Sequence, residues 1–112
     1  MAATVSAPEG TIGLDKPIYT ISVASEILDT HPRTLMMYEN LGLVVPGRTA
    51  TNRRRFSQRD IIKLRLIQRL TRGHGVNLAG VRHILQLLVL LHRQGIKPPA
   101  ELADVDVSQI EV

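Results

Sequence analysis

The side chains best suited to binding a charged partner are arginines, and they are concentrated in the middle of the chain. Nine basic residues lie between positions 48 and 72 against a single acid, Asp60. The densest part is the run Arg53-Arg54-Arg55, and the whole chain carries a net charge of +4. Guanidinium groups are permanently charged, forked donors that suit phosphate oxygens. The cluster therefore predicts a polyanionic partner, because a local basic patch is the footprint of phosphate binding.

The arginine run is predicted to lie on a strand that follows a turn-rich loop. Alternate strand residues face opposite sides, so Arg53 and Arg55 cannot share a face with Arg54. At least one of the three should face solvent, and Arg48 in the preceding loop can join it. An isolated basic triplet is about as often a solvated charge run as a binding site. The helix-break-helix pattern before this one favours nucleic acid.

Two short helical patterns precede the arginines. The first is expected over about residues 22–28 with Ser22 as its N-cap, and residues 29–32 break it. Pro32 suits the first turn of a second helix, which Thr30 or His31 would cap. Gly42 is the expected residue just beyond its C-terminus.

The second helix is the candidate reader of DNA, because early residues of the second helix of a helix-turn-helix face base edges. Tyr38 could donate to a phosphate or pack in the core, and the sequence leaves both open. The predicted DNA-binding residues of the helix and the hairpin are His31, Arg33, Thr34, Met37, Tyr38, Arg48, Arg53, Arg54 and Arg55.

The elements after the second helix complete the predicted fold. Leu43–Pro46 and Arg53–Phe56 should pair as a β-hairpin, or wing. A long helix capped by Ser57 should end near Gly73–Gly75, and a fourth helix capped by Asn77 should run to about Gln94. The predicted class is mainly α, a winged helix-turn-helix with a small hairpin and two following helices. It spans 18–94, between a disordered leader (1–17) and a short acidic tail (95–112) that could be a strand or a frayed helix.

The fourth helix carries a run, Ile84–Leu91, that is apolar almost all round. A surface helix should have a polar face, so one side is expected to contact a partner. The alternative is a fully buried core helix, for which a chain of this size has little material. The predicted dimer interface comprises Leu87, Leu88 and Leu91, and the tail is a further candidate for dimerisation or partner binding.

Several function classes are disfavoured by composition. The chain has no cysteine, its four histidines show no i, i+4 pair, and no nucleophile–base pair stands out. We therefore expect no metal, no cofactor and no enzyme activity. Aromatic residues are 3% of the chain, which argues against base stacking of the single-strand type. The apolar run Leu87–Leu91 is too short to span a bilayer and no signal peptide is visible, so a cytoplasmic location is expected.

The motif residues resemble the MerR family of winged helix-turn-helix regulators. The likeness rests on Thr34–Arg48, which reads TLMMYENLGLVVPGR, together with Arg54-Arg55-Phe56 and Asp60-Ile61. It extends from about Tyr19 to Leu91. In the family an arginine usually stands where this chain has Met36, and the family's long antiparallel dimer helix is hard to find after Pro99.

Within this family the chain is most similar to the heat-shock repressors of the HspR subgroup. The supporting segments are Tyr19–Ser22, His31-Pro32, Arg54–Ser57, Gln68–Leu70 and Gly75–Val81. The resemblance implies a bacterial, nucleoid-associated repressor of chaperone genes. It would bind inverted repeats in double-stranded DNA as a homodimer, with the DnaK chaperone as a candidate co-repressor. The alternatives are a protein-interaction adapter that reads no sequence and a phage or recombination architectural factor.

Overall fold

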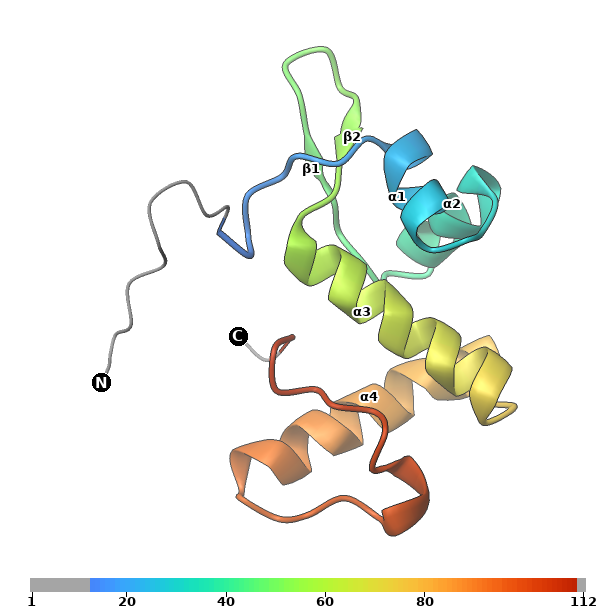
Figure 1. The fold of residues 1–112 in the computed structure, drawn as a ribbon, viewed down its shortest axis with the longest axis vertical. Helices are drawn as coiled ribbons and strands as arrows, with labels where there is room; N and C mark the ends of the chain where they lie inside the picture. The colour runs from blue at the N-terminus through green and yellow to red at the C-terminus, as the bar shows by residue number, and fades with distance from the viewer. Residues whose placement is uncertain (1–12, 111–112) are drawn as a thin grey trace.

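The computed structural model describes residues 13–110, and their fold is mainly helical with one two-stranded antiparallel sheet (Figure 1). The predicted fold class is confirmed. In chain order the elements are α1 (Ile21–Ile27), α2 (Pro32–Asn40), β1 (Gly47–Arg48), β2 (Arg54–Arg55), α3 (Gln58–Gln68), η1 (Arg69–Gly73), α4 (Leu78–Arg93) and η2 (Ala100–Leu102).

The two short helices and the hairpin form the upper part of the molecule in Figure 1, with α3 beneath them and α4 below α3. In the hairpin Gly47 is paired with Arg55 and Arg48 with Arg54. The predicted strand at Leu43–Pro46 is wrong: that segment is an irregular connection, and β1 begins only at Gly47. Leu43 and Val44 are buried there, so their apolar character reflects core packing and not strand pairing.

Each helix start has an identifiable side-chain cap. Thr20 caps α1 by accepting a hydrogen bond from the Val23 amide (3.1 Å), so the prediction of Ser22 as the cap is wrong by two residues. His31 caps α2, which is one of the two predicted choices. Ser57 and Asp60 form a reciprocal capping box at the start of α3, and Asn77 caps α4 as predicted.

One hydrophobic core joins the head to the supporting helices. Phe56, which follows β2, is fully buried, and its backbone pairs with Tyr19 before α1. Leu35 of α2 and Leu64 and Ile67 of α3 are buried in the same core. Gln68 adds a buried hydrogen bond from its Nε2 to the Leu28 carbonyl (2.8 Å). Through these contacts α3 fixes the position of α1 and α2.

The acidic tail packs against its own chain. After the single turn η2, Val105 and Val107 are buried and line a hollow with Leu88 of α4. The structure gives a one-turn 3₁₀ helix at Ala100–Leu102 followed by turns and irregular backbone through residue 110, so the short-helix alternative holds for one turn and the strand alternative is wrong for the described residues. The tail alternates apolar and polar residues, as a strand does. In the structure this alternation places Val105 and Val107 against the core although no strand pairing forms.

The two ends of the described chain meet at Arg59 of α3. Its guanidinium contacts Asp15 (Nε to Oδ1, 2.7 Å) and donates to the Gln109 carbonyl oxygen (2.5 Å). The leader was predicted to be disordered through residue 17. Of that segment, residues 13–17 are described and Asp15 makes this contact, while residues 1–12 lie outside the described part of the chain.

Candidate nucleic-acid interface

The outward face of α2 carries most of the predicted base-reading side chains. His31 and Arg33 are exposed at its N-terminus, Met37 is exposed one turn later, and Thr34 is half-buried between them. Tyr38 is an exception, because it is only 6% exposed and belongs to the core. Its position does not support the prediction that its hydroxyl reaches a phosphate.

The C-terminus of α2 is fixed by a glycine and by a cation from α4. Gly42 follows the helix with φ +75°, a left-handed conformation that favours glycine, as predicted. The Arg82 guanidinium lies so close that a Cβ at position 42 would be 3.3 Å from its Nη2. A positive charge beside the C-terminal end of a helix is favourable, because the exposed carbonyls carry partial negative charge.

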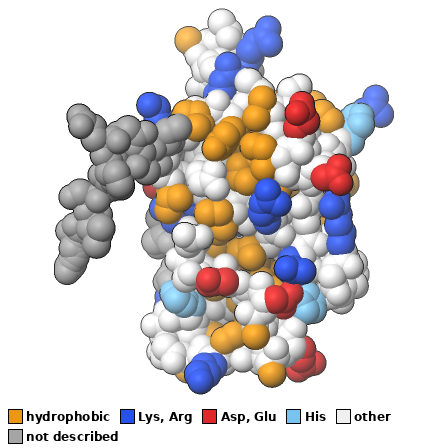
Figure 2. Space-filling view, in the orientation of Figure 1, with side chains coloured by type: hydrophobic (Ala, Val, Ile, Leu, Met, Phe, Trp, Pro, Cys, Tyr) orange, Lys and Arg blue, Asp and Glu red, His pale blue; other side chains and the backbone are white. Residues whose placement is uncertain are grey.

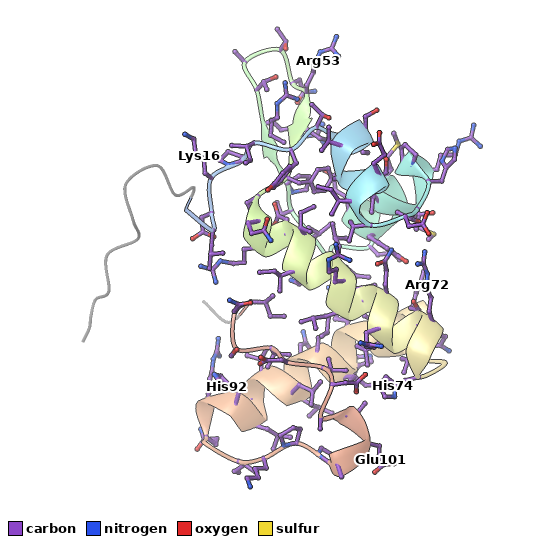
Figure 3. All side chains as sticks on the ribbon, in the orientation of Figure 1. Lys16, Arg53, Arg72, His74, His92 and Glu101 are labelled. Atoms are coloured by element: carbon purple, nitrogen blue, oxygen red, sulfur yellow. The ribbon has the colours of Figure 1, made fainter. Side chains whose placement is uncertain are left out.

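The hairpin projects beyond the helices and presents Arg53 near its tip (Figure 3). Its turn is closed by a hydrogen bond from the Thr49 amide to the Arg53 carbonyl (2.8 Å) and by Asn52 in a left-handed conformation. The Arg53 side chain is exposed. This turn therefore offers an exposed cation near the tip of the hairpin.

Arg48 and Arg54 do not extend freely into solvent, since both pair with Glu39 of α2. Arg54 Nε lies 2.5 Å from Glu39 Oε1, and Arg48 Nη2 lies 2.7 Å from Oε2. Partial burial alone would raise the pKa of Glu39, but the hydrogen bonds from Arg54 and Arg48 outweigh it and lower that pKa. The carboxylate is therefore a charged brace that joins the hairpin to the second helix.

A hollow of about 470 Å³ separates the hairpin from the start of α1. Arg55 lines it and donates from Nη1 to the Arg54 carbonyl (3.0 Å), with the remaining lining from Thr20–Ser22 and Asn52–Arg54. Arg53, Arg54 and Arg55 all line this hollow, and Arg54 also pairs with Glu39.

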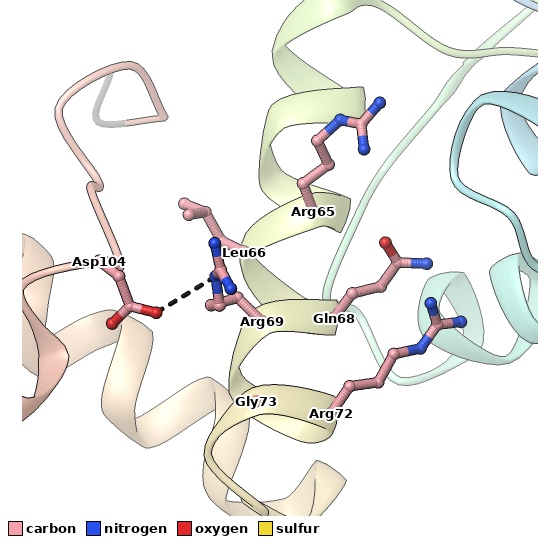
Figure 4. A pocket seen from close by; sticks show the side chains of 7 residues that line it. All are labelled: Arg65, Leu66, Gln68, Arg69, Arg72, Gly73 and Asp104. Atoms are coloured by element: carbon pink, nitrogen blue, oxygen red, sulfur yellow. Dashed lines mark ion pairs between the residues drawn. The ribbon is translucent and has the colours of Figure 1, made fainter.

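Sequence reasoning missed a second basic row, on α3 and η1. Arg65, Arg69 and Arg72 line a hollow of about 460 Å³, and in Figure 4 Arg65 and Arg72 extend toward the head while Asp104 faces Arg69 from the tail. Arg65 Nη2 reaches the Ile27 carbonyl (3.4 Å) and Arg72 Nη2 reaches the Asp29 carbonyl (3.5 Å). The spacing of Arg65 and Arg72 was the available signal, because residues seven positions apart lie on one face of a helix.

Basic side chains on the face shown in Figure 2 lie mainly on the hairpin, α2 and α3. Acidic side chains are interspersed among them. Among residues 13–110 no group of three or more metal-ligating side chains is present, and no helix there is long and apolar enough to cross a membrane.

The predicted dimer residues on α4 occupy different environments. Leu87 is 60% exposed and Leu91 is half-buried, but Leu88 is 4% exposed and faces the valines of the tail. The prediction that Leu88 faces a partner is therefore corrected. Leu90 is exposed beside Leu87 instead. An entirely apolar hollow of about 240 Å³ on this side is lined by Ile84, Leu87, Leu88, Leu90, Leu91, Pro99 and Leu102.

A capped helix pair, a hairpin fixed to the second helix and a supporting α3 make up a winged helix-turn-helix head. Residues 19–88 match the family described as MerR HTH family regulatory protein. The chain belongs to the MerR family. It is thus a DNA-binding transcriptional regulator of the MerR type, and the match covers α1 through most of α4.

The chain is similar in sequence to two kinds of known regulator. It is 51% identical over 73 residues to the heat shock protein HspR of Streptomyces coelicolor, a match that covers 65% of this chain and 48% of that protein. It is 30% identical over 94 residues to the HTH-type transcriptional regulator GlnR of Bacillus anthracis and of Bacillus cereus, covering 84% of this chain and 71% of theirs. The chain spans about half the length of the HspR relative.

Proposed function

We propose that this MerR-family regulator represses heat-shock genes by binding an inverted-repeat operator in double-stranded DNA as a homodimer. The observation that carries the proposal is the Glu39 brace, which holds an arginine hairpin in fixed relation to the exposed face of α2. A rigid pair of contacts of this kind suits a duplex, in which groove and backbone lie at a fixed separation. The 51% identity to HspR supports the heat-shock assignment.

The roles divide between base edges and backbone. Arg33, Thr34 and Met37 on α2 are assigned to the major groove, where guanidinium groups recognise guanine and apolar groups contact the thymine methyl. Arg53 and Arg55 are assigned to phosphates beside the groove. Arg48 and Arg54 act chiefly through the brace, and Arg65 and Arg72 extend the basic surface beside the end of α1 and the turn that follows it.

The dimer is assigned to the exposed apolar side of α4. Leu87, Leu90 and Leu91 lie there beside the apolar hollow, and a second copy would remove this surface from water. A two-fold dimer presents two α2 helices to DNA, and its operator would have matching two-fold symmetry. The protein would act in the cytoplasm at the nucleoid.

Binding of the DnaK chaperone as a co-repressor is carried over from the HspR resemblance. The match covers about half of the HspR relative, so this part of the proposal is supported only by the similarity of the 73 matched residues. Selecting bound fragments from genomic DNA, with and without purified DnaK, tests it. Enrichment of chaperone promoters that increases with DnaK is the expected result, and an unchanged selection contradicts the co-repressor role.

Titration of duplex DNA at several salt concentrations tests the regulator itself. A repressor should prefer one palindrome by about 10³-fold or more over bulk DNA and should show a steep salt dependence. Weak binding without preference would favour the adapter, whose support is the half-buried Met36 at a position where the MerR pattern has an arginine. Bending of DNA at clustered direct repeats would favour the architectural factor.

A further inference from the structure

The acidic tail places one carboxylate directly against the basic surface of η1. Asp104 Oδ2 lies 3.2 Å from Arg69 Nε, and Asp104 Oδ1 lies 3.0 Å from His74 Nε2. The contact is open to solvent, since the Arg69 side chain is 58% exposed and that of Asp104 is 39% exposed. Carboxylate and phosphate oxygens accept hydrogen bonds from the same charged donors. The position that Asp104 occupies would therefore also suit an incoming phosphate.

The hollow beside this contact is lined mainly by cations. Its volume is about 460 Å³, and its charged side chains are Arg65, Arg69 and Arg72 with the single carboxylate of Asp104. One carboxylate does not neutralise three guanidinium groups, so the hollow keeps a net positive charge while Asp104 is in place. A surface with this charge balance attracts a further anion.

The hollow lies next to the turn that leads into the proposed DNA-reading helix. Arg65 Nη2 donates to the Ile27 carbonyl at the end of α1 (3.4 Å), and Arg72 Nη2 donates to the Asp29 carbonyl in the turn (3.5 Å). In Figure 4 both arginines extend toward the head, while Asp104 approaches from the tail on the opposite side. In a helix-turn-helix complex the first helix crosses the DNA backbone. The anion expected at this hollow is therefore a backbone phosphate.

Burial of the neighbouring residues keeps the carboxylate near its cations. Val105 and Val107 are 3% and 5% exposed, and they line a hollow with Leu88 of α4. The Val105 amide donates to the Leu102 carbonyl (2.9 Å), which fixes the backbone next to Asp104. A tethered group of this kind has a high effective concentration at its site. An incoming phosphate has to compete with it, but only the Asp104 side chain has to move.

The Asp104 carboxylate is ionised near neutral pH. Desolvation would raise its pKa, but hydrogen bonds, chiefly with His74, and the nearby Arg69 charge outweigh this effect and lower the pKa below its ordinary value of 3.8. The carboxylate therefore neutralises cations that a phosphate would bind, and it also repels the phosphate. Both effects weaken binding to every duplex alike, because phosphate contacts carry no sequence information.

We propose that Asp104 is an internal competitor for DNA, which holds the cation site formed by Arg69 and His74 in the free protein and yields it to a backbone phosphate in the complex. The inference rests on the proposed function, since a duplex must lie against the α1–α2 turn. The tail thereby lowers the affinity for DNA of any sequence. Tight binding then depends more strongly on the base contacts of α2.

Asp104→Asn tests the competition, and Glu101→Gln is its matched control. Both remove one negative charge from the tail, but Glu101 is exposed on η2 and does not line the hollow. At low salt Asp104→Asn should bind a bulk duplex about two- to fivefold more tightly than the wild type, the range that corresponds to one exposed ion pair. The buried valines still anchor the tail, so the variant should stay folded. Equal gains for the two variants would show a net-charge effect and overturn the proposal.

Arg69→Gln tests whether a phosphate takes the place of Asp104 in the complex. Loss of a phosphate contact should lower the slope of log K against log salt by about one. Lys97→Gln makes the same charge change in the exposed connection after α4, below that helix in Figure 1, and should leave the slope unchanged. In the Arg69→Gln background Asp104→Asn should lose most of its effect, because the charge for which both anions compete is gone. An unchanged slope in Arg69→Gln, or an undiminished effect of Asp104→Asn in that background, would overturn the proposal.

Titration with inorganic pyrophosphate examines the same site without DNA. Nitrogen-15 NMR of the Arg69 Nε–H group should show tighter binding of pyrophosphate to Asp104→Asn than to the wild type or Glu101→Gln. Identical affinities for the three proteins would overturn the competition. If Asp104→Asn gains affinity for pyrophosphate but not for a duplex, the hollow takes a free phosphate compound and the assignment to DNA is overturned. If no variant binds any duplex, the proposed function fails, and the pyrophosphate affinities still show whether Asp104 competes for phosphate.

Discussion

Arg54 Nε lies 2.5 Å from Glu39 Oε1, and this contact joins the hairpin to the second helix across 15 positions of sequence. In the sequence the two residues lie in separate segments, Glu39 in the second helix and Arg54 in the arginine run. The contact means that the hairpin is held in a definite position before any DNA arrives. Preorganisation of this kind lowers the ordering cost of binding.

Glu39→Gln should therefore weaken operator binding although it removes a negative charge near the DNA. The neutral amide cannot pair with two guanidinium groups, so the hairpin loses its fixed position. We expect the preference for the operator to fall while binding to bulk DNA is unchanged or stronger. A stability loss of about 1 kcal/mol is expected for a partly exposed ion-pair network. Denaturant unfolding and DNA titration measure the two effects.

Glu26→Gln on α1 is the control for Glu39→Gln, because Glu26 is exposed and the substitution makes the same change in net charge. It should leave both the operator preference and the stability near wild type. Equal effects of the two substitutions would show that net charge, and not the brace, is what matters.

The same brace predicts a pH dependence of stability. The pKa of Glu39 is lowered below its ordinary value of 4.5 in the folded chain. A group with a depressed folded pKa contributes its stability above the unfolded value and loses it as the pH falls through the folded value. The difference in unfolding free energy between wild type and Glu39→Gln should thus be full above about pH 5 and should shrink below pH 4. A difference that grows on acidification would contradict the assignment.

Arg53→Ala should weaken binding to all duplexes alike. The Arg53 side chain is exposed near the tip of the hairpin and is assigned to a phosphate. Loss of one phosphate contact should lower the slope of log K against log salt by about one. The comparison is Arg54→Ala, which removes the ion pair with Glu39 and should reduce operator preference as well. A changed base preference in Arg53→Ala would place this side chain in the groove.

Gly42→Ala should destabilise the fold through two separable effects. The left-handed φ of +75° disfavours any Cβ, and the new Cβ would meet the Arg82 guanidinium at 3.3 Å. Gly75→Ala is the matched control, because Gly75 has φ +67° and open space around it. Each should lose about 1 kcal/mol from backbone strain, and Gly42→Ala more. Equal unfolding free energies for the two variants would show that the Arg82 contact is absorbed without cost.

The parts of this structure that local rules control could be predicted from sequence. Ser57 and Asp60 form the expected capping box, and Gly42 ends α2 as expected, because both effects act within a few residues. The hairpin was located less well. The apolar residues Leu43 and Val44 suggested a strand, but tertiary packing buries them in a connection, and propensity cannot distinguish the two cases.

The roles of individual site residues depended on contacts that no spacing reveals. The sequence assigns Arg48, Arg53 and Arg54 alike to DNA binding, and only the position of Glu39 in space distinguishes Arg48 and Arg54 from Arg53. The sequence leaves Tyr38 open between core and surface, and its burial in the shared core depends on tertiary packing. Leu88 was placed with Leu87 because the helix is apolar on both sides. The tail that covers Leu88 comes from residues about twenty positions later.

Substitution of neighbouring leucines on α4 separates partner contact from core packing. Leu87→Asp adds a charge to an exposed apolar surface, so the chain should stay folded and become monomeric if the proposed dimer forms there. Leu88→Asp buries a carboxylate against Val105 and Val107 and should cost several kcal/mol, so it should unfold or nearly unfold the chain. Analytical ultracentrifugation and circular dichroism distinguish the two results. A folded Leu87→Asp protein that sediments as a dimer would move the interface away from this side of α4.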